Sequence, residues 1–184
     1  MKRIVILIMA AFLVLPAFTQ ESKKARKQAQ KAAKKEQKMK ENAATAAIIQ
    51  ACIQSRKFVL EAQFLANKKG QRVVVDPILN FIVVNEKKCT FQFGNGRDAG
   101  YNGLGGVTVE GKIFDFKVDE NKKGFNTIKF RATSSTGTIF VNMNISSLGD
   151  AQATISGSTS SRLEYSGIIV PLEESRIYKG SRVF

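Results

Sequence analysis

Hydrophobic and polar positions follow three successive patterns along this chain. Residues 4–15 form an unbroken apolar run, whereas alanine supplies nearly all the apolar positions of residues 20–42. A helical periodicity then appears at four apolar positions, Ile48, Ile49, Cys52 and Ile53. Because this spacing puts the four side chains on one helix face, we expect this helical turn to pack on a core and to end near residues 55–57.

From residue 57 onward, apolar residues alternate with polar ones, as in strands that bury one face. In KFVLEAQFLA, residues 57–66, one side carries Phe58, Leu60, Ala62 and Phe64. Similar segments, separated by turn residues, are QRVVVD, NFIVVN, CTFQFG, VTVEGKIFDFKVD, FNTIKFRAT, GTIFVNMNIS, AQATISGS and RLEYSGIIVP. Short strands at near-regular spacing predict a mostly β fold: an antiparallel meander closed as a sandwich or a flattened barrel, preceded by an N-terminal helix.

Alternation also assigns side chains to faces within two of these strands. In CTFQFG, it puts Thr90 and Gln92 on the face opposite to Phe91. In IFDFKV, unbroken alternation separates Ile113, Asp115 and Lys117 from Phe114, Phe116 and Val118. After Pro171, the tail is expected to add one more short strand or to lie along the surface.

Residues 1–19 have the parts of a secretory signal peptide. A charged start precedes the apolar run, Pro16 breaks it, and Ala17-Phe18-Thr19 offers small residues for cleavage. The run is shorter than the ~20 residues that span a bilayer, and an uncleaved anchor is favoured only by the positive charges that follow. We therefore expect a signal peptide (1–19), a basic helical spacer (20–45) and a single mostly-β domain with an N-terminal helical turn (46–184).

The net charge of +14 is informative mainly for the spacer, where basic residues outnumber acidic ones most strongly. Residues 20–42 hold nine Lys or Arg against three Glu, with no Pro or Gly to interrupt a helix. One interpretation is a solvated spacer. The other is a contact to anionic envelope polymers or lipid headgroups through Lys23, Lys24, Arg26, Lys27, Lys31, Lys34 and Lys35. Nucleic acid is disfavoured as a partner, because no aromatic residues interleave with the charges and export is expected.

The chain contains no His, which excludes several classes of enzyme. Neither a Ser-His-Asp nor a Cys-His pair can form, and two Cys alone supply too few ligands for a usual zinc site. We therefore expect no metal and no cofactor. An acid–base mechanism would have to use Tyr or carboxylates, and the spacing forces no two of these carboxylates together: Glu110, Asp115, Asp119, Glu120 and Glu164.

A glycine-rich loop, residues 94–106, is the candidate ligand site of the β domain. Its side chains with useful chemistry are Arg97, Asp98 and Tyr101. A phosphate-binding loop would lead into a helix, whereas here a strand is expected to follow, so a plain β loop is the simpler interpretation. Loops held on rigid sheets nonetheless often carry binding sites.

Cys52 and Cys89 both fall on apolar faces, one in the helical turn and one in a strand. Export would permit a disulfide between them. Two separate buried thiols are equally compatible with the pattern, since free Cys is among the most buried residue types.

Several segments together carry a family resemblance: KFVLEAQFL, GQRVVVDPILNFIVVN, GVTVEGKI, KGFNTIKF, ISGSTSSRLEYSGIIVP and the closing YKGSRVF. They resemble the exported bacterial domain-of-unknown-function family designated four-two-five-one over most of the chain. The resemblance implies export and a single mostly-β domain behind a helical N-terminus. It brings no catalytic residue with it.

These observations favour an exported binding or structural module without enzymatic activity, in the periplasm or at the outer surface of a bacterium. The alternative is an envelope hydrolase or lyase that uses carboxylates or Tyr. A deep pocket lined by two close carboxylates would favour the enzyme, whereas a smooth sandwich with one exposed apolar or aromatic patch would favour binding.

Cleavage of the leader gives a direct prediction. Cell fractionation followed by mass spectrometry should find the protein outside the cytoplasm, with Gln20 as its first residue. Intact protein that retains Met1 in the cytoplasm would contradict it.

Overall fold

The structure, a computed structural model, describes residues 15–97, 100–121, 125–157 and 162–181, with side chains from Lys23 onward. Most of the expected signal peptide, residues 1–14, therefore lies outside the described residues. Two compact units are distinguished, residues 1–43 and residues 44–184. The second unit contains the β domain.

One long helix and a series of strands follow each other in the described part of the chain. The helix, α2 (Leu15–Ser55), covers the expected spacer and continues into the apolar helical turn. The strands are β1 (Lys57–Asn67), β2 (Arg72–Val74), β3 (Phe81–Asn85), β4 (Lys88–Phe93), β5 (Val107–Glu120), β6 (Asn126–Ser134), β7 (Gly137–Ile145), β8 (Asp150–Ser156) and β9 (Arg162–Pro171).

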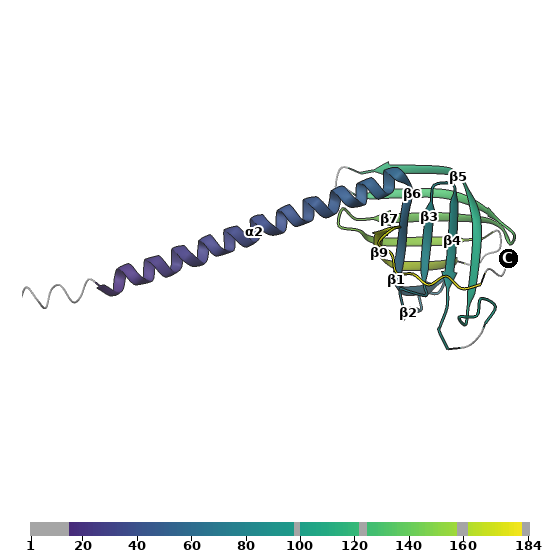
Figure 1. Ribbon diagram of the computed structural model, residues 1–184, viewed down its shortest axis with the longest axis horizontal. Coiled ribbons are helices and arrows are strands. Elements are labelled where there is room, and N and C mark those ends of the chain that lie inside the picture. The colour runs from purple at the N-terminus through teal and green to yellow at the C-terminus, as the bar shows by residue number, and fades with distance from the viewer. Residues whose placement is uncertain (1–14, 98–99, 122–124, 158–161, 182–184) are drawn as a thin grey trace, which may run out of the picture. The chain divides into compact units, whose positions relative to one another are not determined.

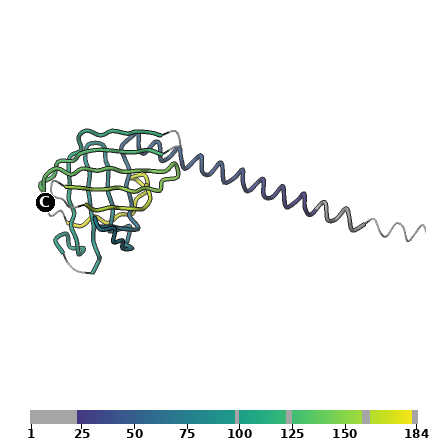
Figure 2. Tube along the Cα trace, turned by 180° about the vertical axis from the view of Figure 1, so that it is seen from behind, coloured from purple at the N-terminus to yellow at the C-terminus, as the bar shows by residue number. Residues whose placement is uncertain are grey.

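The strands form a closed antiparallel barrel (Figure 1). From β3 to β9 each strand pairs with the next one along the chain, and β1 pairs with both β3 and β9, which closes an eight-stranded ring. Short β2 extends the sheet along the end of β1. The predicted fold class, a mostly β antiparallel meander behind an N-terminal helix, is confirmed, and of the two predicted closures the barrel is the one observed. Seen from behind, the wall of β6–β9 faces the viewer (Figure 2).

The seam between β1 and β9 depends on a glycine. The register shifts between Ala62 and Phe64, so β1 carries a bulge where it faces Gly167. The bulge turns Phe64 to the outer face, so the prediction that it shares a side with Phe58, Leu60 and Ala62 is wrong. A Cβ on Gly167 would lie 1.9 Å from the carbonyl oxygen of Glu61. No other residue permits so close an approach of the two backbones, so Gly167 lets the barrel close.

Apolar side chains fill the barrel, as expected for eight strands. They come from every strand of the ring and from the helix, whose contributions are Ile49, Cys52 and Ile53. The helix ends where Arg56 adopts a left-handed conformation, with φ of 56°, a common way to stop an α-helix. Tyr165 reaches across the interior from β9, and its hydroxyl donates to the carbonyl oxygen of Gln92 on β4.

The alternation predicted for IFDFKV is wrong, because β5 contains a bulge. The register against β6 shifts between Phe114 and Lys117, and Asp115 has a positive φ of 52°. The bulge turns Phe116 toward the interior, where its ring stacks on that of Phe130, while Lys117 faces outward. A pattern of period two cannot reveal where one extra residue interrupts it.

The C-terminal tail lies along the surface, one of the two arrangements expected for it. Residues 172–181 cross the outside of β1, β3 and β4 (Figure 1). Gln92 holds this segment: its amide nitrogen donates to the Tyr178 carbonyl at 2.9 Å, and its amide oxygen accepts from the Gly180 backbone at 2.9 Å. Gln92 does point away from Phe91, as predicted, yet the tail buries it completely.

Replacing Gln92 should therefore destabilise the barrel. Gln92→Ala leaves buried partners of the tail and of Thr108 without their hydrogen bonds, so the free energy of unfolding should fall by about 2–3 kcal/mol in urea titrations. Gln54→Ala, at an exposed position of α2, is the control and should change it by less than about 0.5 kcal/mol. Equal effects of the two changes would contradict the role of Gln92.

Candidate functional site

The outer face of β5–β9 presents its side chains in rows that run across the strands. Residue pairing between neighbouring strands defines each row. The first row is Phe114, Arg131, Phe140, Ser156 and Arg162. The second row is Lys117, Lys129, Asn142, Thr154 and Glu164. Cross-strand neighbours lie close enough to act on one ligand together.

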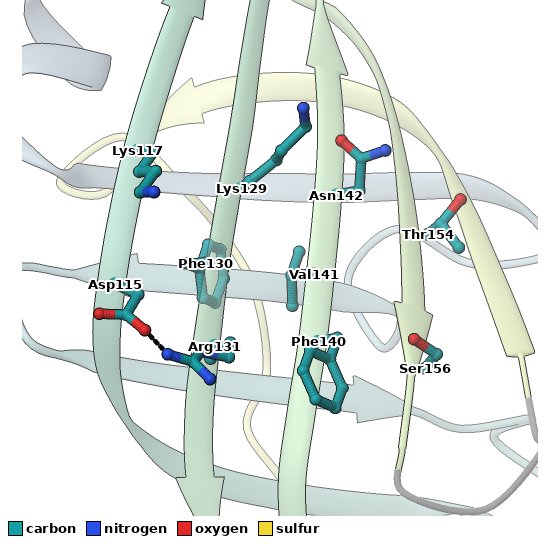
Figure 3. Close-up of a pocket in the computed structure, with 10 residues that line it drawn as sticks. All are labelled: Asp115, Lys117, Lys129, Phe130, Arg131, Phe140, Val141, Asn142, Thr154 and Ser156. Carbon is teal, nitrogen blue, oxygen red and sulfur yellow. Dashed lines mark ion pairs between the residues drawn. The ribbon is translucent and has the colours of Figure 1, made fainter.

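A shallow groove of about 490 Å³ lies over these two rows (Figure 3). We call it the basic groove. Its lining comes from β5, β6, β7 and β8: Asp115, Lys117, Lys129, Phe130, Arg131, Phe140, Val141, Asn142, Thr154 and Ser156. Phe130 and Val141 form its floor from the core, while the others stand on the outer face.

Positive charge is concentrated in the basic groove. Lys117 and Lys129 stand directly opposite each other on β5 and β6. Within the described part of the chain, Lys117 makes no ion pair, and the ammonium of Lys129 is 3.9 Å from the Asp119 carboxylate. Like charges placed directly opposite in a sheet are unfavourable. An anion bound between the two lysines would relieve this repulsion.

The bulge in β5 shapes one end of the groove. Asp115 pairs there with Arg131, whose guanidinium also lies 4.8 Å from the centre of the Phe114 ring. The only carboxylate of the groove lining is thus neutralised by a neighbouring cation. Phe140, which is 44% exposed, offers an open aromatic face beside it.

Of the residues proposed in the glycine-rich loop, Arg97 and Tyr101 do not line this groove. Arg97 and Tyr101 are exposed, and Asp98 lies outside the described residues. Asn102 organises the loop, because its amide oxygen accepts from the backbones of Leu104 and Gly106. Strand β5 follows the loop, so the helix N-terminus that a phosphate-binding loop requires is absent at this position.

The basic residues of the spacer lie on α2 in the other unit, where residues 23–40 are exposed. One ion pair within this stretch joins Glu36 and Lys40. Among the described residues, no helix is long and apolar enough to cross a membrane.

The two cysteines are free, buried thiols, one of the two alternatives left open by the sequence. Burial raises the pKa of Cys89 to about 12 and also raises the pKa of Cys52. Desolvation likewise raises the pKa of Tyr165. All three groups therefore stay protonated near neutral pH and are poorly suited to act as a nucleophile or a base.

The candidate carboxylates are spread over the barrel, and four of the five lie near a cation. Glu110 pairs with Lys179, Asp119 lies near Lys129, and Glu164 lies 4.0 Å from Arg162. Where the structure describes side chains, no three His, Cys, Asp or Glu gather as a metal site would require. The groove thus supplies cations, amides and hydroxyls rather than an acid–base pair.

Sequence reasoning did not identify Lys117, Lys129, Arg131 and Phe140 as a group. Lys129 and Arg131 lie at alternate positions of β6, a pattern that could have indicated a basic outer face from the sequence. The register between β5 and β6 could not be predicted from the sequence, because the bulge at Asp115 decides which residue of β5 lies opposite Lys129.

The chain resembles known proteins at the level of sequence and fold. A family model described as domain of unknown function (DUF4251) matches residues 35–169. The crystal structure of a DUF4251 family protein from Bacteroides eggerthii DSM 20697 is similar, with 29% sequence identity and a TM-score of 0.61. That similarity covers 72% of this chain and 91% of the other. Among curated proteins, none matches the chain at a significant level.

The repulsion across the groove can be measured without any ligand. Lys117→Gln should raise the free energy of unfolding by up to about 0.5 kcal/mol at low salt. The gain should vanish in 1 M NaCl, where the Debye length is ~3 Å. Lys57→Gln, which breaks the ion pair with Glu86, should give no such gain. Identical behaviour of the two variants would contradict the assigned repulsion.

Proposed function

Since the chain belongs to the DUF4251 family, whose description carries no activity, we propose a function from the groove itself: an exported module that binds an acidic polymer of the cell envelope. The module acts by binding and does no chemistry. Its place is the periplasm or the outer surface of a bacterial cell, where the leader would direct it.

The opposed pair Lys117 and Lys129 carries this proposal. A sheet gains stability by separating like charges or by pairing each with a carboxylate. Arg131 adds a third cation, which Asp115 balances, and Asp119 lies 3.9 Å from Lys129. Among the described residues, no carboxylate pairs with Lys117, so the groove keeps a net positive charge. Local rules of stability are most often broken at functional sites.

The form of the groove supports a polymer rather than a small molecule. Small-molecule sites are usually concave and bury most of the ligand. The basic groove is open and crosses four strands, and Asn142, Thr154 and Ser156 add neutral donors and acceptors along it. An elongated ligand can use such contacts in succession.

The remaining features agree with an envelope role. The leader favours export. The spacer presents its Lys and Arg along an exposed helix, which suits a second, weaker contact to the same kind of polymer. A hydrolase or lyase gains no support from the site, because no two carboxylates face each other across the basic groove.

Hyaluronan, a polysaccharide in which glucuronate alternates with N-acetylglucosamine, serves as a probe. In titrations with the full chain, Lys117→Gln/Lys129→Gln should weaken binding at least ~10-fold, because two cations that face the ligand are lost. Binding by the unchanged chain should also weaken as NaCl is raised.

Lys68→Gln/Lys69→Gln is the matched control, since it removes the same charge from an exposed turn outside the groove. It should change the affinity less than ~2-fold, as expected for charges that act only at a distance. Equal losses in both double variants, or no binding by the unchanged chain, would overturn the proposal.

A further inference from the structure

A second groove adjoins the basic groove on the same wall of the barrel, and we infer that the two form one track for a linear acidic glycan. The basic groove takes the acidic sugar and the second groove takes the neutral sugars next to it. This inference rests on the proposed function and adds the ligand's chemical class and the way it lies.

The second groove, which we call the amide groove, has a volume of about 470 Å³. A third row of paired residues runs across it: Asn144, Gln152, Ser166 and Phe64. Its other lining residues are Gln63, Arg72, Phe125, Ser146, Asp150, Ala151 and Gly167. It therefore spans β7, β8, β9 and β1, and it shares β7 and β8 with the basic groove.

The shared strands make the two grooves continuous. Asn142 of the basic groove and Asn144 of the amide groove are two residues apart on β7. Thr154 and Gln152 have the same relation on β8. Two residues along a strand span about 7 Å and return to the same face, so no buried residue separates the two sets of side chains. One ligand can contact both.

The charges of the amide groove are already used within the protein. The guanidinium of Arg72 lies over the Phe64 ring, 3.7 Å from its centre. Asp150 accepts from the Ser146 hydroxyl at 3.2 Å. With one cation and one carboxylate, the lining is neutral overall, unlike that of the basic groove.

The groups that remain suit a hydroxyl-rich ligand. The amide oxygen of Asn144 accepts from the Thr127 hydroxyl at 3.0 Å, and the amide nitrogen of Gln152 donates to Glu164. The amide nitrogen of Asn144, the amide oxygen of Gln152, the Gln63 amide and the Ser166 hydroxyl can donate to or accept from a ligand. Phe125, which is 46% exposed, gives an apolar surface against which the flat face of a sugar ring can lie. Sugar hydroxyls and ring faces match this combination.

Other polyanions fit this pair of grooves less well. Single-stranded nucleic acid needs successive aromatic faces for its bases. Each groove offers one open ring, Phe140 in the basic groove and Phe125 in the amide groove, while Arg131 covers Phe114 and Arg72 covers Phe64. Anionic headgroups would use the lysines but not a row of neutral amides. A glycan that carries acidic and neutral sugars uses both sets.

The test compares hyaluronan tetrasaccharide and octasaccharide on the full chain. The octasaccharide should bind at least ~5-fold more tightly, because only the longer chain fills both grooves. Asn144→Ala/Gln152→Ala should remove most of the advantage of the octasaccharide, as expected for the loss of two net hydrogen bonds to the longer chain. The affinity for the tetrasaccharide should stay within ~2-fold of that of the unchanged chain. Gln54→Ala/Asn85→Ala, at exposed positions outside both grooves and outside the spacer, is the amide-matched control and should change neither affinity.

Each outcome bears on a separate claim. If tetrasaccharide and octasaccharide bind equally and Asn144→Ala/Gln152→Ala has no effect, the track is overturned while the proposed function stands. If Lys117→Gln/Lys129→Gln binds both fragments like the unchanged chain, the proposed function fails as well. Tighter binding of a single-stranded oligonucleotide, or of vesicles with anionic lipid, than of the octasaccharide overturns the glycan as the ligand class.

Discussion

The pairing of β1 with β9 is the constraint on which the rest of the structure depends. It joins the first and last long strands of the meander and turns an open sheet into a closed barrel. Closure removes the exposed edges that would otherwise invite pairing with other chains. It also lets the inward side chains form one core, leaving the outward side chains of β5–β9 free to serve another purpose.

Two β-bulges, one in β1 and one in β5, interrupt the regular pairing of the barrel. The bulge in β1 meets Gly167 and allows the seam to form. The bulge in β5 brings Lys117 opposite Lys129 and lets Asp115 reach Arg131. Bulges are typical where a strand must redirect a side chain, and here one serves closure while the other shapes the basic groove.

The sequence predicted the strands well, because turn residues and alternation report directly on hairpins that bury one face. It also predicted the family, which the match over residues 35–169 confirms. It did not predict the groove, since a site made from rows depends on register between strands, and the bulge at Asp115 is invisible to a simple alternation. Nor did it show that the tail would bury Gln92, a contact across 86 residues.

The barrel supplies a wall on which cations and amides stand in adjacent, ordered rows. We propose that this wall is the ligand-binding surface. Amide chemical shifts of the ¹⁵N-labelled chain, followed during titration with hyaluronan octasaccharide, test that claim most directly. Binding in both grooves predicts shifts on β5 to β9, with the largest on β7 and β8, because these two strands line both grooves. Shifts confined to α2 or to residues 94–106, with β6 and β7 unchanged, would contradict it.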